Sequence, residues 1–326
     1  MQSPLQVFTS SLRTTRARNA LGILVVSLAL FGCDDGNDTL FVSTLGGCAE
    51  TDTCVSNPPL EISSERPATV YIPSDYTTTT RYPLIIVLHG FGANGDLQSA
   101  YFVLQGRVDS RQYVMVTPDG TINAGGSRYW NATPACCAGP DPAAQVDDVG
   151  YIRSLITEAA QTYSIDEQRI SLIGHSNGGF MSLRMACEAS ELISSVVSLA
   201  GSTFAEAASC APADNPVSVL AIHGTDDATI SYDGRPGEFG FPTAPITAER
   251  YASQAGCDVN NPVERTSFDL VTLLDGVDTD VLEYTGCEQN TDVALWTIID
   301  GPHIPLVFGP EGVERIIDWL INHPRS

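Results

Sequence analysis

A serine lies between two glycines in the run Gly174-His-Ser-Asn-Gly178, directly after the apolar stretch 169–173. Glycines two residues before and two residues after a serine let a strand turn sharply into a helix, because the missing Cβ atoms allow the backbone to approach closely. The serine oxygen then points out of the turn, where it can attack a substrate carbonyl carbon. The pattern predicts Ser176 as a nucleophile, provided that an acid and a base accompany it.

A carboxylate suited to this role follows the buried-strand pattern of residues 217–222 in the run His223-Gly-Thr-Asp-Asp227. A serine hydroxyl needs an imidazole that removes its proton and a carboxylate that orients that imidazole. A side chain just past the end of a parallel strand lies on the edge of the sheet where ligands bind. We expect Asp227 to be the acid, because Asp226 would more naturally cap the turn through its own backbone.

His303 is the candidate base, since it follows the apolar run 293–299 in Gly301-Pro-His-Ile-Pro305. The chain has only five histidines, and the other four have structural interpretations. His175 adjoins the nucleophile, where it either contributes to substrate binding or simply packs. Of the remaining three, His89 is expected to shape a loop, His223 to pack in the core, and His323 to lie at the end of the last helix.

The negative charge that develops on an attacked carbonyl oxygen needs backbone N–H donors. One donor should be Asn177, the residue after the nucleophile, and the loop after the early strand 84–88 should supply the other, for which we expect Phe91. The loop 119–142 is rich in Gly, Ala and Pro and carries Trp130, a candidate substrate-binding residue that could equally be a core plug.

The sequence contains no lysine, because all sixteen basic residues are arginine. This composition excludes a Ser-Lys dyad, an imine-bound cofactor and a complete P-loop, each of which requires an amine side chain. No pair of histidines has the spacing of metal ligands. We therefore expect neither a cofactor nor a metal.

Several short motifs together resemble the secreted polyhydroxybutyrate depolymerase and feruloyl esterase group of the α/β-hydrolases over residues 60–326. They are Leu88-His-Gly90, Thr117-Pro-Asp-Gly120, Trp130 with Cys136-Cys137, Asp147-Asp-Val-Gly150, Gly174-His-Ser-Asn-Gly-Gly179 and His223-Gly-Thr-Asp-Asp227. The resemblance implies that Ser176, Asp227 and His303 form the catalytic triad. One departure is the base segment, which reads Asp300-Gly-Pro-His-Ile-Pro305 where many members have G-G-x-H and Trp-Pro.

Strand patterns alternate with helical ones, which predicts an α/β fold with a mostly parallel central sheet flanked by helices in a single domain. The expected strands are 66–72, 84–88, 113–117, 169–173, 195–199, 217–222 and 293–299, and the expected helices are 147–163, 177–189 and 311–322.

The first thirty-two residues read as a signal peptide, with three arginines before a short apolar stretch. The run Leu30-Phe-Gly-Cys33 resembles a lipobox, which implies cleavage before Cys33 and lipid attachment there. Residues 33–59 are expected to be a tether and residues 60–326 the catalytic domain. The protein is then a lipoprotein of the cell envelope, or simply secreted.

Nine cysteines leave eight for disulfides once Cys33 is set aside, which suits an exported protein. We expect Cys48 to pair with Cys54 and Cys257 with Cys287. Bonding between adjacent cysteines requires strain, so Cys136 and Cys137 should reach Cys187 and Cys210 in some order.

The formal net charge of −23 disfavours nucleic acid and anionic lipid headgroups as partners. The only expected membrane contact is the lipid anchor. We expect an exported serine ester hydrolase acting on polyhydroxybutyrate-type oligomers or short-chain esters. The alternatives are a feruloyl or acetyl-xylan type esterase acting on plant-wall esters, a serine peptidase of the same architecture, and a non-catalytic lipoprotein that binds a ligand.

Overall fold

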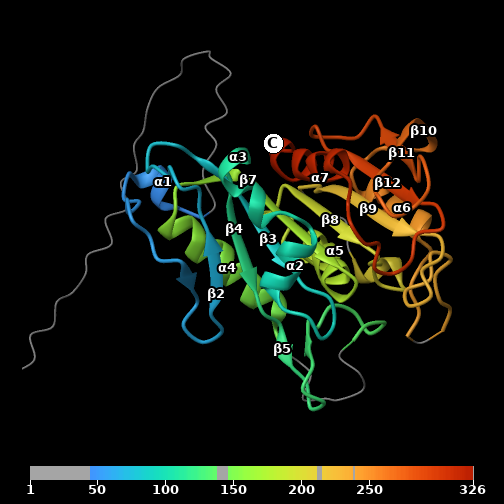
Figure 1. Cartoon of the computed structure of the whole chain (residues 1–326), viewed down its shortest axis with the longest axis horizontal. Helices are drawn as coiled ribbons and strands as arrows, with labels where there is room; N and C mark the ends of the chain where they lie inside the picture. Colours follow the sequence, from blue (N-terminus) through green and yellow to red (C-terminus); the bar gives the residue numbers. More distant parts are fainter. Residues whose placement is uncertain (1–44, 138–145, 211–214, 238, 326) are drawn as a thin grey trace, which may run out of the picture. The chain divides into compact units, whose positions relative to one another are not determined.

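The computed structural model describes residues 45–137, 146–210, 215–237 and 239–325. The predicted signal peptide and the predicted lipid site at Cys33 lie outside these residues. Within them, ten strands form one sheet in the order β1-β2-β4-β3-β7-β8-β9-β12-β11-β10 (Figure 1).

The six central strands of this sheet run parallel to one another, and the strands on both sides of them are antiparallel. The parallel strands are β4 (Val114–Pro118), β3 (Tyr82–Leu88), β7 (Ile165–His175), β8 (Ser195–Leu199), β9 (Ser218–Gly224) and β12 (Val293–Ile298). The outer strands are β1 (Glu61–Ile62) and β2 (Ala68–Tyr71) on one side, and β11 (Thr279–Thr285) and β10 (Asp258–Phe268) on the other. The predicted α/β fold with a mostly parallel sheet is confirmed.

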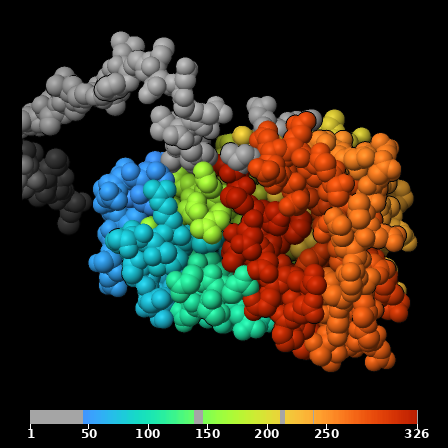
Figure 2. Space-filling view, turned by 90° about the horizontal axis from the view of Figure 1, so that it is seen from above, coloured from blue at the N-terminus to red at the C-terminus, as the bar shows by residue number. Residues whose placement is uncertain are grey.

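Helices cover both faces of the sheet. One face packs against α4 (Asp148–Thr162), α5 (Asn177–Glu188) and α6 (Ala244–Gln254), and the other against α2 (Gly95–Tyr101), α3 (Val108–Arg111) and α7 (Pro310–Asn322). In Figure 2, the red segment that contains α7 borders the orange segment that contains β10 and β11. No helix in the described part of the chain combines the length and apolar composition that a membrane-spanning helix needs.

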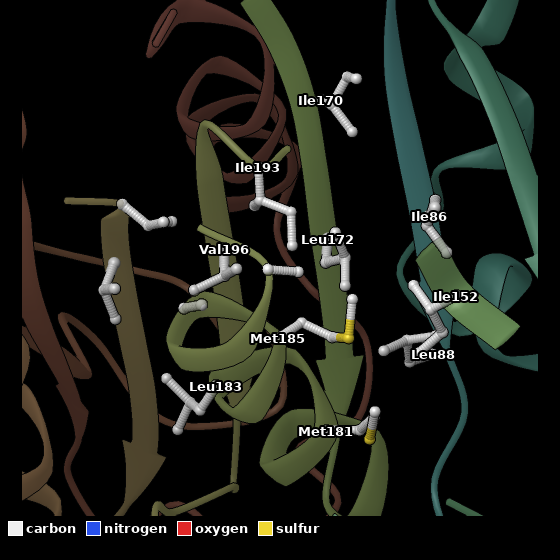
Figure 3. Close-up of a cluster of buried hydrophobic side chains, with 14 of the residues drawn as sticks. Ile86, Leu88, Ile152, Ile170, Leu172, Met181, Leu183, Met185, Ile193 and Val196 are labelled. Atoms are coloured by element: carbon white, nitrogen blue, oxygen red, sulfur yellow. The ribbon is translucent and has the colours of Figure 1, made fainter. Parts of the chain in front are cut away.

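The central strands are buried on both faces because their side chains alternate between two hydrophobic clusters. In β3, Ile86 and Leu88 face the cluster under α4 and α5, whereas Ile85 and Val87 face the cluster under α7. Figure 3 shows the first cluster, where Met181 and Met185 of α5 lie beside strands of the sheet. This packing fixes the strand ends, and it therefore fixes the loops that follow them.

The predicted strands and helices are all present. Each boundary lies within two residues of its predicted position, except that β7 begins at Ile165 rather than at residue 169. Several elements were not predicted. Among them are β1, β10, β11, α2, α3, α6 and the small hairpin of β5 (Thr121–Ile122) and β6 (Arg128–Tyr129) inside the loop 119–142.

Residues 45–59 differ from the tether expected there. They contain the short helix α1 (Cys48–Thr51), and Cys48 is buried. The Gly47 N–H donates to Glu167 Oε1 at 2.8 Å, and the hydroxyl of Tyr163 donates to the Pro59 carbonyl at 2.6 Å. This segment is therefore part of the folded unit, because its backbone polar groups find partners on the domain.

Four disulfides join the eight cysteines of the described residues. Cys48 with Cys54 and Cys257 with Cys287 pair as expected. The expectation for the other four was wrong, because Cys187 bonds to Cys210 and the adjacent Cys136 and Cys137 bond to each other.

Candidate active site

Ser176 lies at the sharp turn between β7 and α5, with φ 54° and ψ −119°. A positive φ is strained for a residue that carries a Cβ atom, and such strain persists only where the surroundings enforce it. A Cβ atom on Gly174 would fall on the carbonyl oxygen of Gly178, and one on Gly178 would fall on the carbonyl oxygen of Leu88. The two glycines therefore permit the close approach of β7, α5 and β3 that the sequence pattern predicted.

Three side chains from distant parts of the chain meet at this turn. His303 Nε2 lies 2.9 Å from Ser176 Oγ, and His303 Nδ1 lies 2.7 Å from Asp227 Oδ2. Each residue follows a different parallel strand, namely β7, β9 or β12, so all three lie at the same edge of the sheet. The His303 side chain is only 15% exposed. The arrangement can accept the serine proton on one ring nitrogen while the other nitrogen donates to a carboxylate.

Asp227 is held by hydrogen bonds on both carboxylate oxygens. Oδ1 accepts from the backbone N–H groups of Thr229 and Ile230, each at 2.8 Å, and Oδ2 accepts from His303. His223 Nε2 also lies 3.3 Å from Oδ2. Burial would raise the pKa of Asp227, but the bonds from His223, His303 and Ile230 outweigh it and lower that pKa. The carboxylate is therefore ionised at neutral pH.

Asp226, the alternative acid, lies exposed, and its backbone N–H donates to the Gly301 carbonyl at 3.0 Å. The structure thus brings Asp227 to the imidazole, whereas Asp226 joins two loops through its backbone.

The two proposed oxyanion donors have backbone N–H groups with no protein partner among the described residues. In the loop 90–92, which we call the oxyanion loop, the Gly90 N–H donates to Gln98 Oε1 and the Gly92 N–H donates to the Arg128 carbonyl. Only the Phe91 N–H is left between them. The N–H of Asn177 at the first position of α5 is likewise unpaired, where the helix dipole favours negative charge.

Trp130 does not line the site, which corrects its assignment as a substrate-binding residue. Its side chain is fully buried, and its Nε1–H donates to the His89 carbonyl at 3.0 Å. The Asn177 side chain also bonds to both the N–H and the carbonyl of Trp130. Trp130 therefore packs in the core, which was the alternative to substrate binding, and its burial is possible because its one polar side-chain atom has an internal partner.

His175 is also buried, and it packs against the base rather than facing solvent. Its Nε2 lies 2.8 Å from the His303 carbonyl oxygen, and the two imidazole rings are 4.9 Å apart. No sequence pattern indicates this contact, which joins the last residue of β7 to a loop residue 128 positions further along the chain.

Among the described residues, no group of three His, Cys, Asp or Glu side chains is arranged to hold a metal ion. A groove of about 760 Å³ lies between α7 and the strands β10 to β12, and none of the three converging residues lines it. The three converging side chains thus lie outside this groove, at the edge of the sheet where Phe91 is 47% exposed.

The family described as "Putative esterase" matches residues 61–233, which include Ser176 and Asp227 but not His303. Putative esterase NocK of Nocardia uniformis subsp. tsuyamanensis is 30% identical over 153 residues, or 47% of this chain and 42% of that protein. Feruloyl esterase D of Neurospora crassa is 26% identical over 250 residues, or 73% of each. The acetyl xylan esterase structure from Aspergillus awamori has the same fold, with a TM-score of 0.57 and 13% identity over 82% of this chain and 97% of that chain.

Proposed function

We propose that this chain, which belongs to the esterase family, hydrolyses carboxylic esters through an acyl intermediate on Ser176. The observation that carries the proposal is the continuous chain of hydrogen bonds from Ser176 Oγ through His303 to Asp227. A hydroxyl becomes nucleophilic when an oriented imidazole accepts its proton, and the three side chains have that arrangement.

In the proposed reaction, Ser176 Oγ attacks the ester carbonyl carbon while His303 Nε2 takes the hydroxyl proton. The resulting oxyanion accepts hydrogen bonds from the N–H groups of Phe91 and Asn177, and Asp227 stabilises the imidazolium. The tetrahedral intermediate expels the alcohol, which receives its proton from His303. A water molecule then attacks the acyl-serine with the same imidazole as base, which releases the acid and restores Ser176.

The relatives favour esters of aromatic acids as substrates, since one of them, covering 73% of this chain, is named a feruloyl esterase. Hydroxybutyrate oligomers are the second candidate. They are favoured by the loop 301–309, which we call the base loop. It places exposed aliphatic side chains next to His303, with Ile304 at 52%, Leu306 at 54% and Val307 at 59% exposure. An apolar rim of this kind suits an aliphatic chain.

We also propose that the protein is exported and anchored by a lipid on Cys33. The four disulfides among the described residues support an oxidising compartment. The test is metabolic labelling with a radioactive fatty acid. Label in the parent and not in a Cys33→Ala variant supports anchoring, whereas unlabelled, secreted parent protein contradicts it.

The function is tested by hydrolysis of p-nitrophenyl acetate, ethyl ferulate, hydroxybutyrate trimers and a peptide anilide. The parent should hydrolyse at least one of the esters, and Ser176→Ala should not. The matched control is Ser154→Ala, because Ser154 lies exposed on α4 and should keep full activity. Ester hydrolysis that survives Ser176→Ala, or a parent that hydrolyses none of the esters, would refute the proposal.

A further inference from the structure

One buried side chain lies between three parts of the proposed catalytic apparatus around Ser176. His175 precedes Ser176 in the chain, and its Nε2 lies 2.8 Å from the carbonyl oxygen of His303. A Cβ atom on Gly90 of the oxyanion loop would lie 3.1 Å from His175 Nδ1. The imidazole therefore fills the space between the nucleophile turn, the base loop and the oxyanion loop.

The proton position on His175 follows from its partner. A carbonyl oxygen only accepts, so Nε2 must carry the hydrogen and donate it to the His303 carbonyl. Burial lowers the pKa of His175 to about 4, so the ring is neutral at the pH at which esterases are assayed. The titratable groups that influence it are His303, Asp227 and His223. A neutral ring adds no positive charge beside His303 when His303 becomes an imidazolium.

A second contact holds the same base loop. Tyr101, on α2, donates its hydroxyl hydrogen to the Pro305 carbonyl at 2.8 Å, and its ring packs against His175 at 5.6 Å. The backbone on both sides of Ile304 is thus held by hydrogen bonds to the carbonyl groups of His303 and Pro305. Ile304 itself points away, with half of its side chain exposed. The base loop thus exposes Ile304, Leu306 and Val307, while the carbonyl groups of His303 and Pro305 have internal hydrogen-bond partners.

A similar arrangement recurs at the ends of two other parallel strands. His89, after β3, accepts the Gly120 N–H on Nε2 and donates from Nδ1 to the Gly90 carbonyl at 2.8 Å. His223, near the end of β9, donates from Nε2 to the Ile230 carbonyl at 2.7 Å. Each of these buried histidines holds a loop that carries a different part of the apparatus. The contact made by His175 is therefore one of three similar contacts.

We propose that His175 is a positioning residue that fixes the imidazole of His303 by hydrogen bonding to its backbone carbonyl. The inference rests on the proposed function, because it assigns His175 to the serine-ester mechanism. Displacing a reacting group by about 1 Å can cost about a hundredfold in rate. Loss of the Nε2 donor should therefore lower kcat and leave ester binding at the exposed rim unchanged.

The experiment compares His175→Gln with His175→Leu on p-nitrophenyl acetate. The amide nitrogen of glutamine is as many bonds from Cβ as histidine Nε2, so it can donate to the same carbonyl, whereas leucine has no donor. We expect His175→Leu to lower kcat about tenfold to a hundredfold with KM within about twofold of the parent. His175→Gln should restore kcat to within about threefold of the parent, which a role in packing alone would not produce.

The matched controls are His323→Gln and His323→Leu, since His323 bonds to the Trp319 carbonyl and to Asp292 at the end of α7, far along the chain from the turn. Both controls should keep the parent kcat. If His175→Leu does not fold, His175→Met replaces it, and the kcat of His175→Gln alone decides if neither folds.

Equal kcat values for the leucine and glutamine variants would overturn the inference, and so would a folded His175→Leu with the parent kcat. These outcomes differ from failure of the proposed function, in which the parent itself would hydrolyse no ester or Ser176→Ala would remain active.

Discussion

Replacing Asp227 by asparagine tests the proposed acid, and the structure determines which way the amide would face. Asp227 Oδ1 accepts two backbone N–H groups, from Thr229 and Ile230, at 2.8 Å each. An asparagine oxygen must stay there, because an NH₂ group would face two donors. Its NH₂ group then points to His303 Nδ1, where the carboxylate accepted a hydrogen at 2.7 Å.

This orientation places the histidine hydrogen on the wrong nitrogen. An amide NH₂ donates to Nδ1, so the imidazole keeps its hydrogen on Nε2 and cannot accept the proton of Ser176. We expect kcat of Asp227→Asn to fall about 10⁴-fold, which corresponds to about 5 kcal/mol of transition-state stabilisation. The assay is steady-state release of p-nitrophenol at pH 7.5, with circular dichroism to show that the variant is folded.

Asp226→Asn is the matched control, because Asp226 is the adjacent and exposed carboxylate. Its kcat should stay within about twofold of the parent, as expected for a surface substitution. A folded Asp227→Asn that keeps more than about a tenth of parental kcat would refute the tautomer argument, since a wrong tautomer costs far more than that. A large loss in Asp226→Asn would move the acid to the neighbouring residue.

Three further predictions concern stability, each read from urea unfolding. Gly178→Ala should lower the free energy of unfolding by about 1 to 3 kcal/mol or more, since its Cβ would fall on a carbonyl oxygen of β3. The control is Gly106→Ala, whose Cβ meets open space, so the free energy of unfolding should hardly change. Parental stability after Gly178→Ala would contradict the close approach. The double variant Cys187→Ser and Cys210→Ser should lose about 3 kcal/mol, because it opens a loop of sequence separation 23, and an unchanged midpoint would contradict the bond. Burial lowers the pKa of His175 to about 4 in the folded protein, whereas the pKa of an unfolded histidine is about 6.5. Between pH 6.5 and pH 4 the unfolded chain therefore binds more protons than the folded chain, so the free energy of unfolding falls as the pH falls. His175→Gln should lose less stability than the parent between pH 7 and 4.5, and equal losses would show that His175 is not the titrating group.

The strands and helices with strong periodicity were predictable, because their side chains meet one continuous core. The central strands are uniform apolar runs, and α7 buries Val313, Ile316 and Leu320 on one side. The order of the motifs along the chain also predicted which side chains would meet. His303 lies 127 residues from Ser176, yet both follow parallel strands and therefore lie at one edge of the sheet.

The elements that were missed have weak local signals. β10 is exposed along most of its length and contains Asn260-Asn261-Pro262, which reads as a loop. It is a strand because β11 supplies its hydrogen-bond partners. Residues 45–59 are polar and proline-containing like a linker. The contacts that order them come from residues outside the segment, among them Glu167, Tyr163 and Arg81.

The hydrogen-bond partners of buried polar atoms were the least predictable part of the site. Trp130 was assigned to substrate because aromatic side chains in long loops commonly bind ligands. Its Nε1–H instead finds the His89 carbonyl, 41 residues away, which allows complete burial. The carbonyl bonded by His175 could not be inferred either, because any of many loop carbonyls could have accepted its proton.

The most direct test of the account is covalent labelling of the nucleophile with a p-nitrophenyl alkylphosphonate, followed by mass spectrometry of the digested protein. The account predicts one phosphonyl group per chain on the peptide that contains Ser176, with release of one equivalent of p-nitrophenol. Labelling should be lost in Ser176→Ala and strongly slowed in His303→Gln. Ester turnover by a parent protein that carries no label, or a label on any other residue, would contradict the claim that Asp227 and His303 make the Ser176 hydroxyl reactive.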